Sequence, residues 1–579
     1  MLSNSVVAGF LASGYVLALV LQLNPSLPFA PARLLPLAAT ISLFYTLQLA
    51  VVFYVALVGR QLLAREPFSP AWVSVGVLVW LGAAASAAGA ALMLGNLRTF
   101  ALAVEPRTSR ALVSSAFALV ASAALFLVIA LLRGRSGPRG RAAWAVLAAL
   151  TAAASLAAPM AFRGPAAPAR PAPRPTDIAA HAGAPDRAAR VTVIAIDAGS
   201  LDYITSAAAE GRLPNFGRVL DAGAVMRMAT LHPTSADAVW AAVATGKMPQ
   251  KNGVRSAAAY QLPRGGDVVQ LLPDYCYAHG LVRFGFLVEQ PLTSAALRAR
   301  PVWSILSALD IRVGVVAWPL THPAPAVNGY LVSDAYWRLS PTPSAPDDAS
   351  AIFPPALGPE VAAAAEAAAT EATLGASAAP SDALDMRDAE ATRAARVDDR
   401  IAQTLDAGYP AQVTLVRYQS LDPIGHYFLR YALPSEFGDV SDEEVRRHGS
   451  VLDEHYAIVD GAVGRAIASL GPDDLLLVAS GYGMEPIGFL RRLLEQAIGD
   501  PNLSGTHEAA PDGFLMAYGA SVARGRLQAR ASVVDVVPTV LYYLGLPIGR
   551  DMDGYARTDL FHRRFTDERP ITFIPTYER

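Results

Sequence analysis

The sequence predicts a two-part protein: an all-α membrane region of about five helices, followed by an α/β domain with a mostly parallel sheet flanked by helices. Three observations lead to this prediction. Hydrophobic residues make up 53% of the chain and charged residues only 17%, and the apolar excess lies at the front. A proline-rich segment follows it. Beyond that segment, short β-branched runs alternate with amphipathic stretches, which is typical of repeated strand–helix units.

Five apolar stretches are found before residue 165, at roughly 6–23, 34–58, 72–95, 111–132 and 142–162. Each is about long enough to cross ~30 Å of hydrocarbon as a helix. The third and fifth are rich in small residues, which suits close helix packing in lipid. A cleaved signal peptide is the alternative for the first stretch, but that stretch lacks a basic start and further spans follow it.

Arginines predict the orientation of these spans. The loop between the fourth and fifth spans carries Arg133, Arg135, Arg139 and Arg141. Loops rich in arginine stay in the cytoplasm, so the N-terminus is expected inside and the C-terminal domain outside the cytoplasm. The loop at residues 98–110, which holds three arginines on the opposite side, counts against this. We therefore predict a multi-pass protein of the inner or plasma membrane with an extracytoplasmic C-terminal domain.

The domain borders follow from changes in composition. Residues 1–162 form the predicted transmembrane region, 163–189 a stiff linker rich in proline and alanine, and 190–579 the α/β domain. VTVIAID, VGVVAW, VTLVRY, LLLVAS and FLMAYG are its predicted buried parallel strands. An alanine-rich insertion at 341–395 interrupts the pattern. Surface helices, a lid or a disordered insertion are all consistent with it.

Charge and cysteine usage exclude some functions. The formal net charge is −2, so no nucleic-acid polymer is expected as a partner. Cys276 is the single cysteine, which excludes an intrachain disulfide and a thiolate metal cluster. The oligomeric state is left open.

Possible metal ligands follow several of the predicted strands. Asp197 ends VTVIAID, Asp422 and His426 follow VTLVRY in the segment DPIGH, and His507 lies in SGTHE. Ligands of an open parallel sheet gather at the carboxyl ends of its strands. Carboxylates and imidazoles in such a set can hold zinc where a phosphate ester reacts.

These residues belong to a longer pattern. VTVIAIDAGSLDYI, HPTSADAVWAAVATGKMPQKNGV, LDPIGH, GTHEAAPDGFLMAYG and DVVPTVLYYLGLPIGRDMDG occur in this order along the α/β domain. In these segments the chain resembles the alkaline phosphatase superfamily, in particular its type I phosphodiesterase/nucleotide pyrophosphatase branch. The resemblance covers nearly all of 190–579 and implies an alkaline-phosphatase-like sheet flanked by helices. The membrane region lies outside it.

The resemblance implies a site with two zinc-class ions beside a Thr or Ser nucleophile at a helix N-terminus. Asp422, His426 and His507 would bind one ion, and Asp197 would bind the other together with the nucleophile. The phosphoryl group would pass through a covalent enzyme ester to water or to an acceptor alcohol. Zinc is the expected metal, with manganese as an alternative.

Two departures from the family pattern alter this expectation. A Ser-Asp-His-Gly segment usually completes the second ion site, but here LLLVAS leads to Gly481 and Tyr482. We therefore expect one bound ion and a degraded second site. The family nucleophile aligns with Ala236, and the hydroxyls of Thr234 and Ser235 lie just before it. Thr234 is favoured over Ser235; alternatively, both residues only cap the helix.

The sequence thus predicts a membrane-anchored, metal-dependent phosphoesterase, acting as a phosphodiesterase, phosphomonoesterase or phosphotransferase through a Thr or Ser nucleophile. Its location suits lipid head groups or envelope glycans as substrates. The alternative is a degenerate, weakly active or inactive member that binds a ligand or serves as a membrane scaffold. A transporter is disfavoured, because the spans contain no charged residue that would mark a path.

Overall fold

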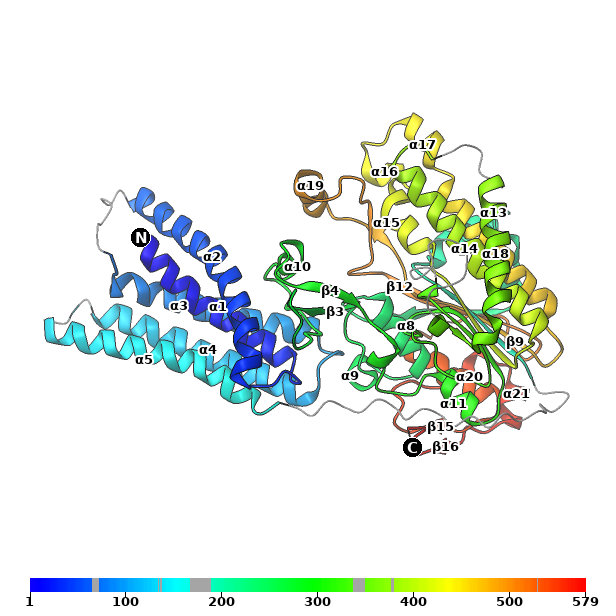
Figure 1. Ribbon diagram of the computed structural model, residues 1–579, viewed down its shortest axis with the longest axis horizontal. Helices are drawn as coiled ribbons and strands as arrows, with labels where there is room; N and C mark the ends of the chain where they lie inside the picture. Colours follow the sequence, from blue (N-terminus) through cyan, green and yellow to red (C-terminus); the bar gives the residue numbers. More distant parts are fainter. Residues whose placement is uncertain are drawn as a thin grey trace. The chain divides into compact units, whose positions relative to one another are not determined.

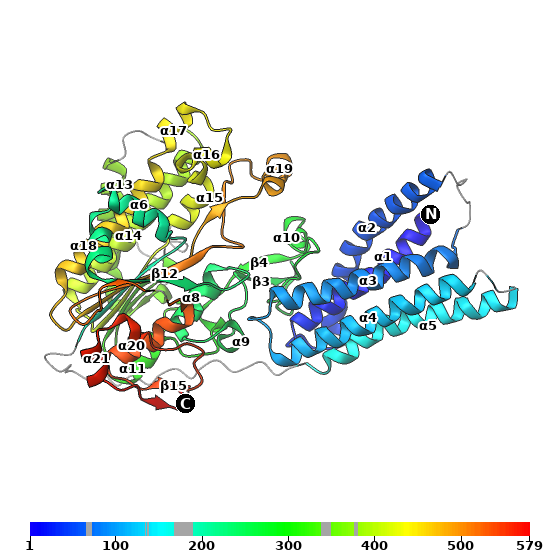
Figure 2. The same ribbon diagram turned by 180° about the vertical axis from the view of Figure 1, so that it is seen from behind.

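The computed structural model divides into two compact units (Figures 1 and 2). The first comprises residues 1–170 and 258–291, and the second comprises 171–257 and 292–579. The structure describes residues 1–64, 72–133, 135, 138–166, 189–336, 349–375, 380–527 and 529–578. Most of the predicted linker, 163–189, lies outside these ranges.

The first unit contains five helices long and apolar enough to cross a membrane, as predicted. They are α1 (Leu2–Leu23), α2 (Pro31–Ala64), α3 (Val75–Thr99), α4 (Pro106–Arg133) and α5 (Pro138–Arg163). Large apolar side chains such as Leu47, Val51 and Phe117 are exposed on these helices. Apolar surface of this kind is typical of helices that face lipid.

Hydrogen bonds between polar side chains link the helices of this bundle. The Tyr15 hydroxyl on α1 lies 3.0 Å from Ser86 Oγ on α3 and 2.7 Å from Ser155 Oγ on α5. Gln22 Nε2 donates to Ser115 Oγ on α4 at 2.6 Å. An unpaired polar group is costly in hydrocarbon, so these pairs fix how the helices pack.

A hairpin from the middle of the chain, far from the apolar helices in sequence, completes the first unit. It consists of β3 (Ala258–Gln261) and β4 (Val288–Pro291), which pair antiparallel, with the short helix α10 (Gly280–Arg283) between them. Asn24, just after α1, accepts hydrogen bonds from the backbone N–H groups of Gln270 and Leu271 at 2.8 and 3.0 Å. The sequence analysis had included this segment in the domain 190–579. The structure packs it against the membrane helices instead.

The second unit is built on a sheet of ten strands within the described residues. In spatial order they are β13 (Gly525–Arg526), β2 (Ala224–Ala229), β12 (Asp512–Tyr518), β9 (Leu475–Tyr482), β1 (Val191–Ile196), β8 (Val413–Tyr418), β5 (Val313–Trp318), β6 (Gly329–Ser333) and β7 (Ile352–Phe353), with β14 (Ala531–Ser532) also pairing with β2. From β9 to β6 all pairs are parallel, whereas β12 and β7 run antiparallel to their neighbours. The predicted mostly parallel α/β sheet is confirmed.

Helices cover both faces of this sheet (Figures 1 and 2). Along β1, Val193 and Ala195 enter one core and Ile194 and Ile196 the other. The first core is covered by α8 (Ala236–Thr245), α11 (Val302–Ala308) and α20 (Val536–Tyr543). The second is covered by α6 (Leu201–Ala209), α7 (Pro214–Ala222), α13 (Gly358–Gly375), α14 (Ala383–Gly408), α15 (Leu421–Ala432) and α18 (Val451–Ser469). Both faces are buried, which explains the continuous apolar runs of the parallel strands.

Shorter elements complete the second unit: α9 (Pro249–Asn252), α16 (Pro434–Phe437), α17 (Asp442–His448), α19 (Phe489–Ile498), α21 (Arg563–Glu568), β10 (Glu485–Pro486), β11 (Gly505–Thr506), β15 (Ile548–Gly549) and β16 (Phe573–Ile574). The described part of the insertion 341–395 forms β7, α13 and the start of α14. Val361, Ala365 and Ala391 from these helices are buried in the second core. Alanine at such positions lets the helices pack close to their neighbours.

Candidate metal centre

Asp422 and His426 are positioned by α15, the helix that follows the central strand β8. The two side chains lie four residues apart, so one turn of helix brings them to the same face. The helix begins beyond the carboxyl end of a parallel strand, where ligands of open α/β sheets bind. Both side chains therefore lie on the helix that follows β8, the strand after which the sequence analysis expected them.

His507 reaches the pair from a different part of the chain, after β11. The Ser504 N–H donates to the His426 carbonyl oxygen at 2.7 Å, which holds this segment against α15. Gly505 permits the approach, because a Cβ there would lie 2.3 Å from the Gly425 carbonyl oxygen. A glycine is therefore required to bring His507 to the helix.

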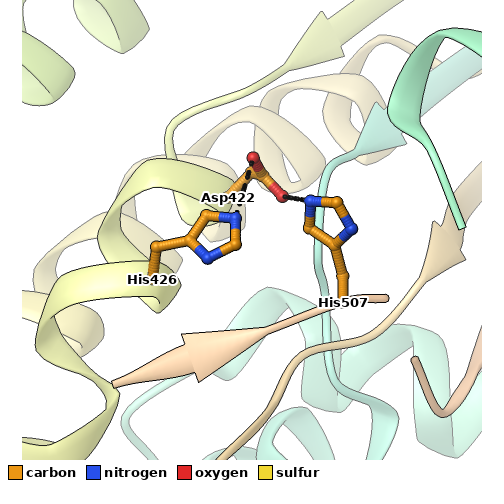
Figure 3. Close-up of side chains that lie close together, drawn as sticks. All are labelled: Asp422, His426 and His507. Carbon is orange, nitrogen blue, oxygen red and sulfur yellow. Dashed lines mark ion pairs between the residues drawn. The ribbon is translucent and has the colours of Figure 1, made fainter. Parts of the chain in front are cut away.

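The three side chains converge on one point (Figure 3). Asp422 lies between the two imidazoles: its Oδ2 is 3.8 Å from His426 Nε2, and its Oδ1 is 3.5 Å from His507 Nε2. One donor atom from each residue lies within 4.8 Å of the others. Donors bound tetrahedrally to zinc at ~2.0–2.1 Å would be about 3.4 Å apart. The donor set and its spacing therefore fit one zinc-class ion.

Neighbouring groups orient these donors. His426 Nδ1 donates to the Gly505 carbonyl oxygen at 2.8 Å, and Nε2 is the ring nitrogen that faces Asp422. The Tyr482 hydroxyl donates to Asp422 Oδ1 at 3.3 Å. Burial raises the pKa of Tyr482 well above its ordinary value, and the charges of Asp197 and Asp422 raise it further. The phenol therefore stays protonated and acts as a donor.

Comparison with known proteins identifies the family. A model of the type I phosphodiesterase / nucleotide pyrophosphatase family matches residues 191–538, which is more than half of the chain. The chain belongs to this family. The family hydrolyses phosphate esters, and the match places the chain among the hydrolases of such bonds.

Comparison with solved structures finds murine ectonucleotide pyrophosphatase / phosphodiesterase 5, as an inactive variant in complex with AMP, at 12% identity and a TM-score of 0.37. That match covers 65% of this chain and 100% of the murine chain. The human protein matches with the same identity and score, over 64% of this chain and 100% of its own. Among curated proteins, no relative matches.

Asp197, the fourth predicted ligand, is not among the three residues whose donor atoms lie within 4.8 Å of one another, although burial and the charge of Asp197 both raise the pKa of Asp422. Its carboxylate forms a two-pronged ion pair with Arg417 of β8: Arg417 Nε donates to Oδ1 at 2.9 Å, and a terminal nitrogen donates to Oδ2. Trp240 Nε1 also donates to Oδ1, at 2.6 Å. A metal role for Asp197 stays a prediction, and these three bonds count against it.

The position where the phosphodiesterase family usually carries an aspartate offers no room for one. It is occupied by Gly481, and a Cβ on Gly481 would lie 2.3 Å from Val239 Cγ1. The next residue, Tyr482, is fully buried and donates to Asp422. These residues do not fit a second ion, as the sequence analysis expected from glycine and tyrosine.

The two candidate nucleophiles precede α8 and differ in their hydrogen bonds. The Thr234 hydroxyl donates to the Leu231 carbonyl oxygen at 2.8 Å. The Ser235 hydroxyl is buried and has no hydrogen-bond partner among the described residues. Ser235 is the N-cap residue of α8, but its side chain makes no capping bond. The Thr234 N–H donates to the Glu508 carbonyl oxygen at 3.4 Å, which places both residues beside the segment that carries His507.

The sequence analysis missed Arg417 and the bond from Trp240 to Asp197. Arg417 was inside the quoted strand VTLVRY, and a charged residue in an otherwise apolar central strand is itself a signal, because it needs a buried partner. Trp240 lies in the core. Its ring N–H gave no separate signal in the sequence.

Proposed function

We propose that this protein is a membrane-anchored, metal-dependent phosphoesterase whose centre is formed by Asp422, His426 and His507. The convergence of one carboxylate and two imidazoles from separate segments is the observation that supports it. Two neutral imidazoles and a carboxylate leave a tetrahedral ion one open position for substrate. Zinc is the proposed metal and manganese the alternative. A divalent ion at this place would polarise the phosphoryl group and stabilise negative charge on its oxygens.

The attacking group is proposed to be the hydroxyl of Ser235 or Thr234. The hydroxyl oxygen forms the new bond to phosphorus as the bond to the departing alcohol breaks, and that alcohol leaves with the hydroxyl proton. Water or another alcohol then cleaves the enzyme ester and restores the hydroxyl. Both residues directly precede the first turn of α8, and the N–H groups of a helix N-terminus can bind phosphate oxygens. The unpartnered hydroxyl of Ser235 favours it over Thr234.

The second unit is proposed to lie outside the cytoplasm. With α1 to α5 crossing in alternation, the arginine-rich loop after α4 lies at one end of the bundle, and the end of α5 at Arg163 lies at the other. The hairpin 258–291 supports this, because it binds Asn24 and Asn96, which lie at or near the carboxyl ends of α1 and α3. These ends and that of α5 are on the same side.

An inactive, ligand-binding protein is the second candidate. The family nucleophile position is Ala236, and Asp197 is engaged by Arg417. Both observations favour this candidate over full activity. Turnover by the purified protein separates the two.

The test uses the full-length protein in detergent or nanodiscs, with an aryl phosphodiester and an aryl phosphomonoester as substrates. We expect turnover with added Zn²⁺ or Mn²⁺, loss of turnover with a chelator, and loss of both turnover and bound metal in Asp422→Asn and His507→Ala. His279→Ala, which changes an exposed histidine of the hairpin, is the matched control. Metal binding without turnover on either ester would support the inactive candidate. Absence of bound metal would refute the centre itself.

A further inference from the structure

Arg417 is an unusual residue for the centre of a parallel sheet. It lies on β8 directly opposite Ala195 of β1, two residues before Asp197. Its side chain is 8% exposed and that of Asp197 is 2% exposed. A charge buried this deeply is costly unless it is paired and hydrogen-bonded. Hydration therefore does not explain why a charged pair is present at this buried position.

The opposite charges of Arg417 and Asp197 balance each other, and all three guanidinium nitrogens have an acceptor. Two guanidinium nitrogens bind the two carboxylate oxygens, and the third is 3.5 Å from the Ala317 carbonyl oxygen. Burial lowers the pKa of Arg417, but Asp197 more than offsets this and leaves it raised. The guanidinium is thus a permanent cation. The planar fork of arginine suits this two-pronged geometry, which lysine cannot reproduce.

The guanidinium binds the carboxylate to which the resemblance assigns the second ion. The resemblance implies that Asp197 would hold that ion together with the aspartate and histidine that are replaced here by Gly481 and Tyr482. In this chain the Asp197 carboxylate holds Arg417 instead. Val239 fills the space beside Gly481. Gly481 and Tyr482 lack the two ligands that the resemblance implies, and Arg417 supplies a positive charge at Asp197.

The exchange also conserves charge. A divalent ion and the additional family aspartate contribute a net charge of +1, and a guanidinium with glycine contributes the same. A chain that had merely lost its ion would be left with Asp197 unneutralised in the core.

We propose that Arg417 takes the place of the second metal ion, so that the catalytic unit uses one exchangeable ion and one built-in cation. This rests on the proposed metal centre at Asp422, His426 and His507. Arg417 acts here as a positioning residue: it holds Asp197 and supplies a fixed positive charge beside the centre. The catalytic site is therefore expected to bind one ion, independent of metal concentration in the working range.

The first test counts ions in the full-length protein saturated with Zn²⁺ or with Mn²⁺ and then desalted. We expect one ion per chain, and none in His507→Ala. Two ions in the wild-type protein would overturn the replacement by Arg417 and leave the proposed function intact. No ion would overturn the metal centre on which the proposal rests.

The second test restores the family ligands. Gly481→Asp and Tyr482→His are combined with Val239→Ala, which makes room for the new side chain, in the presence of Arg417 and again with Arg417→Ala. We expect one ion while Arg417 is present and two when it is removed. Two ions with Arg417 present, or one ion after its removal, would show that the guanidinium does not occupy the site.

A variant that lacks both charges separates an effect on metal binding from an effect on folding. Asp197→Asn with Arg417→Met removes both members of the pair without leaving a lone buried charge, and such exchanges are often tolerated. We expect it to fold and to keep the single ion at Asp422. Loss of that ion in a folded variant would mean that the ion depends on Asp197, which the proposal denies.

Discussion

At the scale of single residues, the site depends on which polar groups are already engaged. Thr234, Asp197 and Tyr482 each have a defined hydrogen-bond partner, whereas the Ser235 hydroxyl has none among the described residues. A buried hydroxyl without a partner carries a desolvation cost of about 1–3 kcal/mol. A substrate phosphate that accepts from it would remove that cost.

Replacing Ser235 by alanine is expected to lower kcat/KM by at least about a hundredfold, because a nucleophile has no substitute. Thr234→Val keeps the shape of the side chain and is expected to lower kcat/KM by less than about tenfold, since the Thr234 hydroxyl donates to the Leu231 carbonyl oxygen. Steady-state kinetics on an aryl phosphodiester measure both. The reverse order of effects would identify Thr234 as the nucleophile.

Gly481→Ala is expected to destabilise the protein by about 1–3 kcal/mol, because the new methyl group would overlap Val239 Cγ1. Val239→Ala should restore much of this loss in the double variant, since the two side chains share one space. Chemical denaturation of the four proteins in the cycle gives the coupling energy. Additive losses would show that the two positions do not compete.

The sequence pointed to the residues that the structure brings together, but not to their surroundings. Asp422, His426 and His507 stand out because their residue types, spacing and positions after strands can be seen in the sequence; their role as ligands stays a prediction. Arg417 and Val239 were not found, because their roles come from β8 and α8 packing side by side with β1 and β9. A pairing between distant segments leaves little trace in either segment alone.

At the scale of elements, the centre depends on how β11 meets α15. The two are joined by the bond from Ser504 to the His426 carbonyl oxygen and by the absence of a side chain at Gly505. Four of the five predicted strands are buried and parallel, and both faces of the sheet are covered. FLMAYG forms β12, which is buried but runs antiparallel to β9 and β2, so the prediction of a parallel strand was wrong there. Two-residue strands such as β11 carry no periodic pattern, so neither this contact nor the hairpin at 258–291 could be predicted.

Gly505→Ala is expected to weaken metal binding by about 10–100-fold, because the segment that carries His507 must move away from the Gly425 carbonyl oxygen. Gly488→Ala is the matched control, since no atom lies within 4 Å of a Cβ built there. Competition with a fluorescent zinc chelator measures both affinities. Equal affinities in the two variants would contradict the role assigned to Gly505.

At the scale of the whole molecule, one unit contains five apolar helices and the other contains the proposed metal centre. Composition places the hairpin 258–291 with the α/β domain, whereas the structure groups it with the apolar helices. Hydrophobic content alone does not reveal that the short segment 258–291 belongs to the first unit. Contacts from Asn24 and Asn96 mark it in the structure.

Labelling of single cysteines tests the orientation. Burial raises the pKa of the Cys276 thiol to about 11, so this only native cysteine is expected to react slowly near neutral pH. With a membrane-impermeant maleimide on intact cells, Ser469→Cys should be labelled, and Arg135→Cys should be labelled only after the membrane is broken. The opposite pattern would place the catalytic unit in the cytoplasm. The unchanged protein measures the background from Cys276.

The hairpin gives the molecule a second means of attachment. The chain passes between the two units three times, near residues 170, 257 and 291. If a protease sequence is inserted between residues 163 and 189 and cut, the catalytic fragment still contains β3 and β4, which remain docked on the bundle. It should sediment with the membranes until a denaturant is added. Such an enzyme would resist shedding from the cell surface, since a single cleavage could not release it.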